Sequence, residues 1–203
     1  MILARAARSL VRLAPRLSRR RGVPSRGTWS SAASSLAVFA AGVALLLASA
    51  CSLVERPNAR RASCLLEGRA LVELSGLAEF VEVSGGVRAF ISVQNAPPGA
   101  HGVFVVEGKS CNDTGVHFNP HRQAHGAPQA DTHHAGDLGN LIVDEQGVGT
   151  LEIVCDGLSV NDPETTVIGK FLVITERPDD YVTQPAGGSG AKLACGEILP
   201  NRR

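Results

Sequence analysis

The sequence predicts an all-β domain, built as an eight-stranded antiparallel β sandwich or barrel. Three observations support this prediction. Beyond residue 62, eight short segments rich in Val, Leu and Ile are separated by turn residues. None of these segments shows a convincing helical period. Glycine-containing turns such as Ser84-Gly85-Gly86 and Glu145-Gln146-Gly147 join neighbouring segments, and glycine suits such turns because it accepts positive φ angles.

The N-terminal segment, residues 1–50, is interpreted as an export signal. Eight arginines lie within residues 5–26, and an uncharged run over residues 27–54 follows, most apolar over residues 36–50. Its end, Ala48-Ser49-Ala50-Cys51, resembles a bacterial lipobox, in which the cysteine receives lipid, although the usual leucine sits one place early at Leu47. An uncleaved transmembrane anchor is the alternative, because about 20 apolar residues span a bilayer. Both interpretations predict a membrane-anchored protein in the periplasm or at the cell surface.

The remaining chain is predicted to contain a tether and one acidic domain. Residues 51–62 would form the lipid-anchor cysteine and a short polar tether, and residues 63–203 the folded domain. Residues 51–203 hold 12 of the 20 Lys and Arg residues and all 19 Asp and Glu residues, a formal charge of −7. The domain therefore lacks the basic character expected of a nucleic-acid-binding protein.

The eight predicted strands follow one another at short spacing. They contain many β-branched residues. Because the domain has only five Phe and one Tyr, its core would consist mostly of Val, Leu and Ile. The expected strands are residues 65–74, 77–83, 87–94, 103–107, 141–144, 148–154, 167–174 and 193–199.

Two connections are too long for simple hairpins. Residues 108–140 hold five of the six histidines, and residues 175–191 are rich in Pro, Gly and Asp. Long loops in a compact β domain are usually functional or disordered. The histidine content favours a function for the first loop.

The first loop contains a candidate metal site. Its side chains follow the pattern His117-x7-His125-x8-His134-x2-Asp137. Three imidazoles and one carboxylate suit a tetrahedral zinc ion. Because four protein ligands leave no open position, the pattern predicts one structural zinc ion.

A series of short segments lies in a fixed order along residues 64–199. These segments are His101-Gly102, Glu107, Cys111, His117-Phe118-Asn119-Pro120, His125-Gly126, Gly136-Asp137-Leu138-Gly139-Asn140, Pro178-Asp179-Asp180-Tyr181 and Leu193-Ala194-Cys195-Gly196. In this order they resemble the copper/zinc superoxide dismutase family, and the tail that begins at Pro178 is closest to its bacterial branch.

The resemblance implies a Greek-key β sandwich, a fold that this enzyme family adopts, with a disulfide between Cys111 and Cys195. It also implies that the zinc ligands are His117, His125, His134 and Asp137, and that His117 would bridge zinc to copper. The family's other three copper histidines fall on Phe104, Val106 and Thr175.

These three substitutions argue against copper binding. Phenylalanine and valine offer no lone pair, and copper prefers imidazole nitrogen or sulfur to a threonine hydroxyl. Dismutation needs a metal that changes oxidation state, and zinc does not. Phe104 and Val106 lie two apart on a strand and so face the same way. We expect them to form a small hydrophobic patch that is either available to a protein partner or covered by the second loop.

At two further family positions, either the residue type or the number of histidine partners differs from the family. The arginine that guides superoxide falls on Lys192, which keeps the charge and loses the planar donor geometry. The carboxylate that would brace a zinc histidine and a copper histidine falls on Asp179, which here can orient only His125.

The remaining histidines and cysteines have structural interpretations. His121 and His133 are expected to be exposed loop residues, and His101 a hydrogen-bonded core residue. Cys64 and Cys155 could pair with each other or remain free or intermolecular thiols.

Two functions follow from the pattern. The first is a zinc-binding, superoxide dismutase-like module without copper-dependent activity. The alternative is a dismutase in which His117, with His121, His133 or a shifted loop, binds a redox metal.

Overall fold

The computed structural model describes residues 60–201 except residues 70 and 71, and this part of the chain is built from antiparallel β-strands. Because polar and apolar residues alternate along most of these strands, one face of each strand enters the core. The strands are β1 (Arg61–Gly68), β2 (Ser75–Val83), β3 (Gly86–Gln94), β4 (Gly99–Ser110), β5 (Asp113–His117), β6 (Asp137–Val143), β7 (Gly149–Cys155), β8 (Phe171–Thr175), β9 (Lys192–Glu197) and β10 (Leu199–Pro200).

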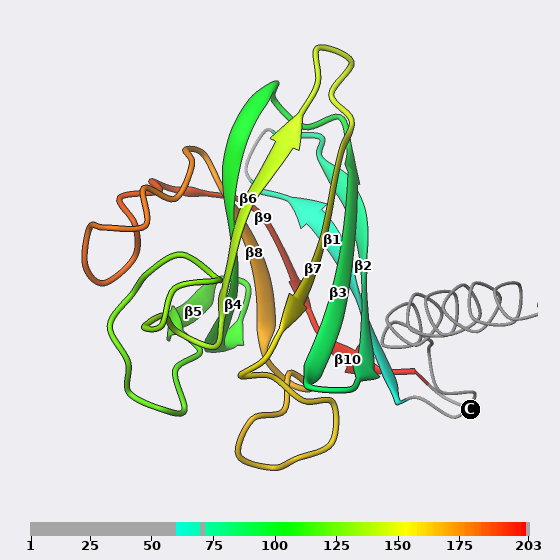
Figure 1. Ribbon diagram of the computed structural model, residues 1–203. Coiled ribbons are helices and arrows are strands. Elements are labelled where there is room, and N and C mark those ends of the chain that lie inside the picture. Colours follow the sequence, from blue (N-terminus) through cyan, green and yellow to red (C-terminus); the bar gives the residue numbers. More distant parts are fainter. Residues whose placement is uncertain (1–59, 70–71, 202–203) are drawn as a thin grey trace, which may run out of the picture. The chain divides into compact units, whose positions relative to one another are not determined.

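Eight of these strands close into a barrel (Figure 1). Their order is β1-β2-β3-β7-β6-β4-β8-β9, and β9 pairs again with β1. The β6–β7 hairpin separates β3 from β4, so these two consecutive strands are not neighbours, which is a Greek-key crossover. The predicted all-β, eight-stranded antiparallel fold is confirmed.

The barrel interior is packed mainly with aliphatic side chains. Inward residues such as Leu66, Ile91, Leu141 and Ile174 are almost fully buried in one continuous cluster. Full burial of such a side chain stabilises the fold by about 1.5–3 kcal/mol relative to exposure. This cluster supplies a rigid wall on which the long loops are held.

Strands β4 and β8 are buried on both faces. In β4 six consecutive residues, His101 to Val106, are buried, and all five residues of β8 are buried. The outward-facing side chains form a second, smaller cluster outside the barrel. It contains Phe104, Val106, Phe171, Val173 and Cys195, with Cys111 packed against it.

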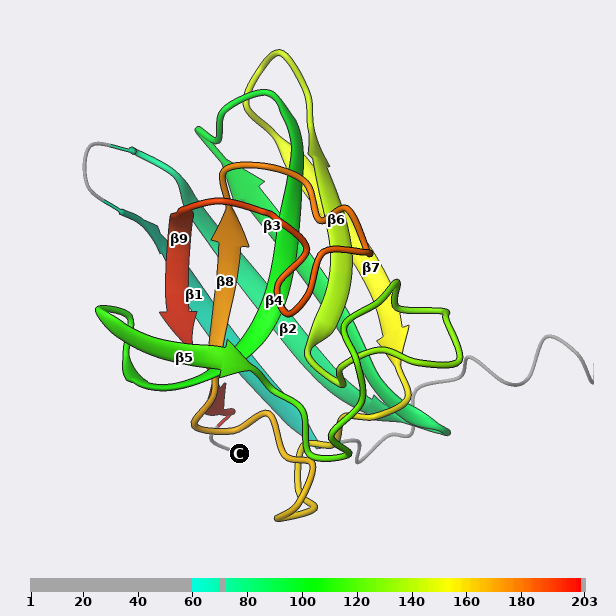
Figure 2. The ribbon, with the colours of Figure 1, turned by 90° about the vertical axis from the view of Figure 1, so that its left-hand side faces the viewer.

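Both long loops lie on the side of the barrel formed by β4 and β8 (Figure 1). In the view of Figure 2, β5 crosses in front of the barrel strands, and the two loops lie on the same side. The structure also contains the predicted disulfide between Cys111 and Cys195, which ties the β4–β5 turn to β9. The outer face of β4 and β8 is therefore the floor of the candidate site.

Each expected strand overlaps one barrel strand, but some boundaries differ. β1 begins at Arg61, inside the segment expected to be a tether, because Arg61 and Ala62 pair with β2. β1 ends at Gly68, where an added Cβ atom would meet the Val72 carbonyl oxygen at 2.0 Å. The expected loop over residues 108–140 also contains β5, which pairs with β4.

Candidate metal centre

Three different elements supply the four predicted zinc ligands. His117 is the last residue of β5, His125 lies in the following loop, and Asp137 begins β6 three residues after His134. The loop between His117 and His125 is turned by the side chain of Asn119, which accepts a hydrogen bond from the Gln123 backbone N–H at 2.9 Å.

Close backbone contacts hold β6 against this loop. Gly136 accepts a hydrogen bond from the backbone N–H of Val105 and donates one to the Phe118 carbonyl oxygen. An added Cβ atom at Gly136 would lie 2.2 Å from the Val105 carbonyl oxygen. Only glycine therefore fits at this position without moving Asp137 away from the histidines.

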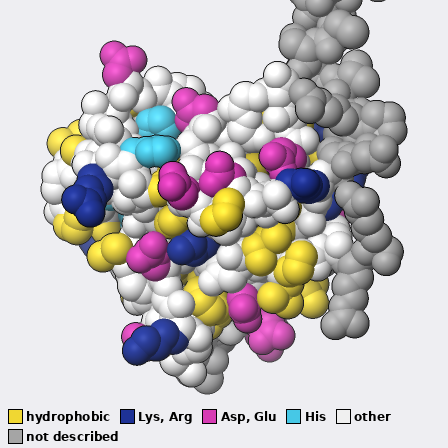
Figure 3. Space-filling model, turned by 90° about the horizontal axis from the view of Figure 1, so that it is seen from below, with side chains coloured by type: hydrophobic (Ala, Val, Ile, Leu, Met, Phe, Trp, Pro, Cys, Tyr) yellow, Lys and Arg dark blue, Asp and Glu magenta, His cyan; other side chains and the backbone are white. Residues whose placement is uncertain are grey.

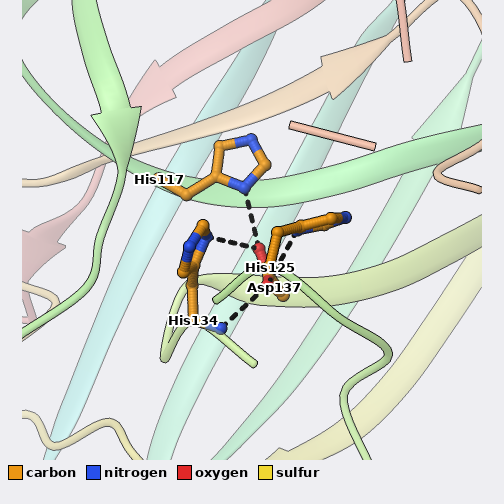
Figure 4. A group of neighbouring side chains, drawn as sticks. All are labelled: His117, His125, His134 and Asp137. Atoms are coloured by element: carbon orange, nitrogen blue, oxygen red, sulfur yellow. Dashed lines mark hydrogen bonds and ion pairs between the residues drawn. The ribbon is translucent and has the colours of Figure 1, made fainter. Parts of the chain in front are cut away.

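The four side chains converge, as Figure 4 shows, and one ligating atom from each lies within 4.8 Å of the others. Nδ1 of His117 lies 2.8 Å from Oδ1 of Asp137, and Nδ1 of His125 lies 3.0 Å from Oδ2. Nδ1 of His134 lies 3.4 Å from Oδ1. All four residues are buried.

This donor set fits a zinc ion. The ligands of a tetrahedral zinc ion are about 3.3 Å apart, given zinc–nitrogen distances of about 2.0–2.1 Å, and the distances above are close to this value. His134 Nδ1 is buried and makes no hydrogen bond among the described residues. A buried nitrogen without a partner is costly, and a cation at the centre of the cluster would satisfy it.

The protonation states also suit metal binding. Burial lowers the pKa of His134 below its usual value, and the attraction of Asp137 opposes this only in part. Burial alone would raise the pKa of Asp137, but hydrogen bonds from the His117 side chain and the His134 backbone N–H, with the charges of His125 and His117, hold it below its usual value. Neutral imidazoles and an ionised carboxylate are the forms that bind metal.

Asp179, in the second long loop, braces the cluster from outside. Its Oδ1 lies 2.8 Å from Nε2 of His125, the ring nitrogen opposite the one that faces Asp137. Its Oδ2 is buried and makes no hydrogen bond within the described part of the chain. Asp179 therefore orients one histidine, as expected, and its second oxygen has no histidine to orient.

Two side chains that fix the second loop were not predicted from the sequence. Asn140 donates from Nδ2 to the Asp179 carbonyl oxygen and accepts from the Asp179 N–H. Gln184 accepts from the His125 N–H and donates to the His125 carbonyl oxygen. The Asn140 contact could have been suspected from its place in the matched segment around Asp137, whereas no local signal marks Gln184.

Phe104, Val106 and Thr175, the three residues expected at copper-ligand positions of the family, line a cavity together with His117 and His134. Phe104 stacks on the His117 ring with centroids 4.0 Å apart. Phe104 is 0% and Val106 3% exposed. Thr175 is also buried, and its hydroxyl lies 3.1 Å from the carbonyl oxygens of Gly102 and Arg177. None of these three side chains offers an imidazole nitrogen, and the hydroxyl of Thr175 is already hydrogen-bonded.

Phe104 and Val106 face the same way, but they are not exposed as a patch. They form the floor of a cavity of about 530 Å³ that the second loop covers in part through Gln184, Pro185 and Ala186. Of the two arrangements expected for this pair, cover by the second loop is the one observed, and a protein partner at this site stays a prediction. Burial follows because β5 and both loops pack over this face of β4 and β8.

The other histidines do not join the cluster. Both ring nitrogens of buried His101 lie 2.8 Å from carbonyl oxygens, those of Thr175 and Pro97, which confirms its structural interpretation. His121 is exposed and His133 is partly exposed, and both line a different pocket beside Asp156. Figure 3 shows histidine side chains next to acidic ones at the surface.

The two remaining cysteines of the described domain are free. Cys64 on β1 and Cys155 on β7 are buried thiols, and they lie on strands that are not adjacent in the barrel. Burial raises the pKa of each thiol to about 12. Of the alternatives left open by the sequence, free thiols are the ones observed.

Lys192, the expected counterpart of the guiding arginine, lies at the start of β9 and lines the cavity. Its ammonium group donates a hydrogen bond to the hydroxyl of Thr114 on β5. The cavity therefore combines an apolar floor with one cationic side chain.

Comparison with known proteins agrees with this geometry. Residues 74–198 match the family model described as copper/zinc superoxide dismutase (SODC). The chain belongs to the copper/zinc superoxide dismutase family. It is also 34% identical over 141 residues to the extracellular superoxide dismutase [Cu-Zn] of Caenorhabditis elegans. That alignment covers 64% of this chain and 63% of the relative, so the chain spans less than two thirds of the relative's length.

The predicted N-terminal features lie outside the described residues. These are the export signal over residues 1–50, the lipid-anchor Cys51 and most of the tether that follows it. Among the residues that the structure describes, no helix is both long enough and apolar enough to span a membrane.

Proposed function

We propose that this protein is an exported, membrane-anchored member of the superoxide dismutase family that holds one zinc ion and lacks copper-dependent dismutase activity. Its role would be structural or ligand-binding. The observation that carries this proposal is the stacking of Phe104 on His117, because a buried aromatic ring takes the place that a copper ligand needs.

His117, His125, His134 and Asp137 would hold the zinc ion. Zinc in a closed four-ligand site supplies folding free energy and no redox chemistry. Asp179 would keep His125 in the orientation that directs Nδ1 to the metal. The disulfide between Cys111 and Cys195 and the metal would together hold the first loop on the barrel.

Three observations support export. The arginine-rich start and the apolar run before Cys51 have the order of an export signal. A disulfide is typical of proteins in oxidising compartments. The relative from Caenorhabditis elegans is named as extracellular. Lipid on Cys51 is proposed as the anchor, with an uncleaved transmembrane segment as the other form of attachment.

Metal analysis tests the proposal. The purified protein, incubated with both zinc and copper and then passed through a chelating column, should retain one equivalent of zinc and no stoichiometric copper. Its dismutase activity under copper-replete conditions should equal that of the free metal. One equivalent of tightly bound copper, or activity well above that of free copper, would refute the proposal.

The same activity measurement, repeated on His117→Ala, tests the alternative of a remodelled redox site at His117. If such a site exists, the redox activity should disappear in His117→Ala. Activity that is equal in His117→Ala and in the unmodified protein would exclude His117 as its metal ligand. His121 and His133 would need to move to contribute, because they line the pocket beside Asp156.

A further inference from the structure

A second, smaller pocket is lined mainly by polar side chains of the first long loop and of the segment after β7. Its volume of about 270 Å³ is below the range of about 300–1,000 Å³ that is usual for pockets that hold organic ligands. No apolar side chain larger than alanine lines it in the described part of the chain. Its size and lining suit a hydrated ion better than an organic molecule. The lining residues are His121, Gln123, Asp131, His133, Ala135, Asp156 and Gly157.

The charge of this pocket favours a cation. The carboxylates of Asp131 and Asp156 line it together with two imidazoles, and neither a lysine nor an arginine is among its lining residues. Imidazole nitrogen and carboxylate oxygen are donors that divalent transition-metal ions bind in proteins. The donor types present are therefore those of a metal site.

His133 is already oriented for metal binding. Its Nδ1 lies 2.9 Å from the Ala130 carbonyl oxygen, and because a carbonyl oxygen only accepts hydrogen bonds, Nδ1 carries the ring proton. The lone pair of the neutral ring is then on Nε2, which lies 3.6 Å from Oδ1 of Asp156. This separation is close to the value of about 3.3 Å for two ligands of one tetrahedral metal ion. A backbone carbonyl that fixes the tautomer in this way is a common outer partner of a ligating histidine.

His121 supplies a second imidazole that no other interaction engages. The residue is exposed and lines the pocket, and its ring makes no hydrogen bond or ion pair with any described residue. The Asp156 side chain is 77% exposed. Exposed side chains change rotamer on the picosecond to nanosecond timescale, so both residues can adjust their positions around an ion without a change in the barrel.

The pocket is separate from the buried four-ligand cluster. None of the four clustered residues lines it. His133 is next to His134 in the chain, but its ring faces Asp156, whereas the His134 ring faces Asp137. An ion in the pocket would therefore be additional to one in the cluster.

We infer that this pocket is a second metal site, which binds a divalent ion of the nickel, copper and zinc group through His121, His133 and Asp156. Water would complete the coordination. Three exposed or partly exposed ligands should bind more weakly than the buried cluster, so a chelating column would empty this site. Because Asp156 directly follows β7, the ion would attach the first long loop to the barrel at a further point.

Nickel binding to the zinc-loaded protein tests the inference, because elemental analysis counts nickel separately from zinc. Protein that retains one equivalent of zinc after the chelating column is titrated with Ni²⁺ in a calorimeter. It should bind one equivalent of nickel saturably, and the zinc should stay bound. His121→Ala and Asp156→Asn should each weaken nickel binding at least about tenfold, since loss of even an outer partner of a metal ligand has an effect of that size. Both variants should keep one equivalent of zinc, which shows that they fold.

Asp113→Asn is the matched control, because Asp113 is an exposed carboxylate of β5 that does not line the pocket. It should bind nickel as tightly as the unmodified protein. The inference is overturned if the zinc-loaded protein binds no nickel, or if nickel releases an equal amount of zinc. Equal nickel affinity in Asp156→Asn and Asp113→Asn would also overturn it. The zinc content after the column tests the proposed function separately, so zinc-loaded protein that binds no nickel refutes the second site and leaves the proposed function intact.

Discussion

The two sides of His117 have opposite chemistry. On its Nδ1 side, two histidines and Asp137 converge to within metal-binding distances. Against its ring face, Phe104 packs at 4.0 Å over a floor of Val106 and Val173. The same strands and loops hold both sides of this histidine.

The side of His117 that faces the other three predicted zinc ligands depends on the arrangement of the strands. Asp137 begins β6, and its side chain touches all three histidines and the His134 backbone N–H. The copper positions instead lie on the outer face of β4 and at the end of β8, where apolar side chains pack as well as imidazoles. Loss of one of the four clustered ligands would loosen the first loop, whereas the side chains of Phe104 and Val106 belong to a hydrophobic cluster.

Removing the shared carboxylate should have the largest effect. In Asp137→Ala, three buried imidazoles lose their common partner and zinc loses a ligand, so zinc affinity should fall about a thousandfold, or about 4 kcal/mol. Competition with a chromogenic chelator measures this. Asp131→Asn, an exposed carboxylate in the same loop, should bind zinc normally. Unchanged zinc affinity in Asp137→Ala would mean that the cluster is not the zinc site.

Truncating the Phe104 ring should lower the stability of the fold and leave the zinc content unchanged. Phe104→Ala removes a fully buried ring, and such a change destabilises a fold by about 3–4 kcal/mol. Zinc content should stay at one equivalent. Urea unfolding of the zinc-loaded protein measures the loss, and Val116→Ala, whose side chain is 66% exposed, should stay within about 0.5 kcal/mol. Loss of zinc in Phe104→Ala would show that the two sides of His117 are not independent.

Substitution of Asp179 tests whether the metal site includes residues beyond the four predicted ligands. Asp179→Asn keeps the shape and removes the charge that orients His125, so zinc affinity should fall about 10–100-fold. Asp180→Asn, at the neighbouring exposed residue, should have no effect on zinc affinity in the same chelator competition. A wild-type affinity in Asp179→Asn would place this residue outside the metal site.

The two buried thiols lie in the barrel core, apart from the metal cluster, and have no effect at neutral pH, where both stay protonated in the folded and the unfolded chain. Their pKa is about 12 in the folded protein and about 9 in the unfolded chain, so the folded state keeps protons that the unfolded state releases. Stability should therefore fall as the pH rises above about 9, by about 1.4 kcal/mol per pH unit for each thiol.

Urea unfolding between pH 8 and pH 10.5 measures this slope. The double variant Cys64→Ala/Cys155→Ala should show a shallower decline than the unmodified protein, whatever its stability at pH 8. Equal slopes in the two proteins would contradict the burial of these thiols.

Much of the fold could be predicted because it depends on local patterns. Runs of β-branched residues bounded by turns identified all eight barrel strands. The misjudged boundaries lie where pairing with a distant strand decides the outcome: Arg61 is in a strand because it pairs with Val81, and β5 forms because it pairs with β4. The short β5 segment is too polar to be recognised without its partner.

The donor chemistry of the site can be predicted from the sequence alone. Which side chains can bind a metal is a property of residue type, and the spacing of His117, His125, His134 and Asp137 is enough to identify the group. The absence of imidazoles at Phe104, Val106 and Thr175 is equally visible without coordinates.

The surroundings of those residues can be seen only in the folded domain. That Phe104 is buried against His117, that Asp179 has one unused oxygen, and that Lys192 lines the same cavity as His117 depend on contacts between distant segments. The physical reason is that burial is set by what packs over a strand, and the second loop, β5 and the disulfide reach this face from separate parts of the chain.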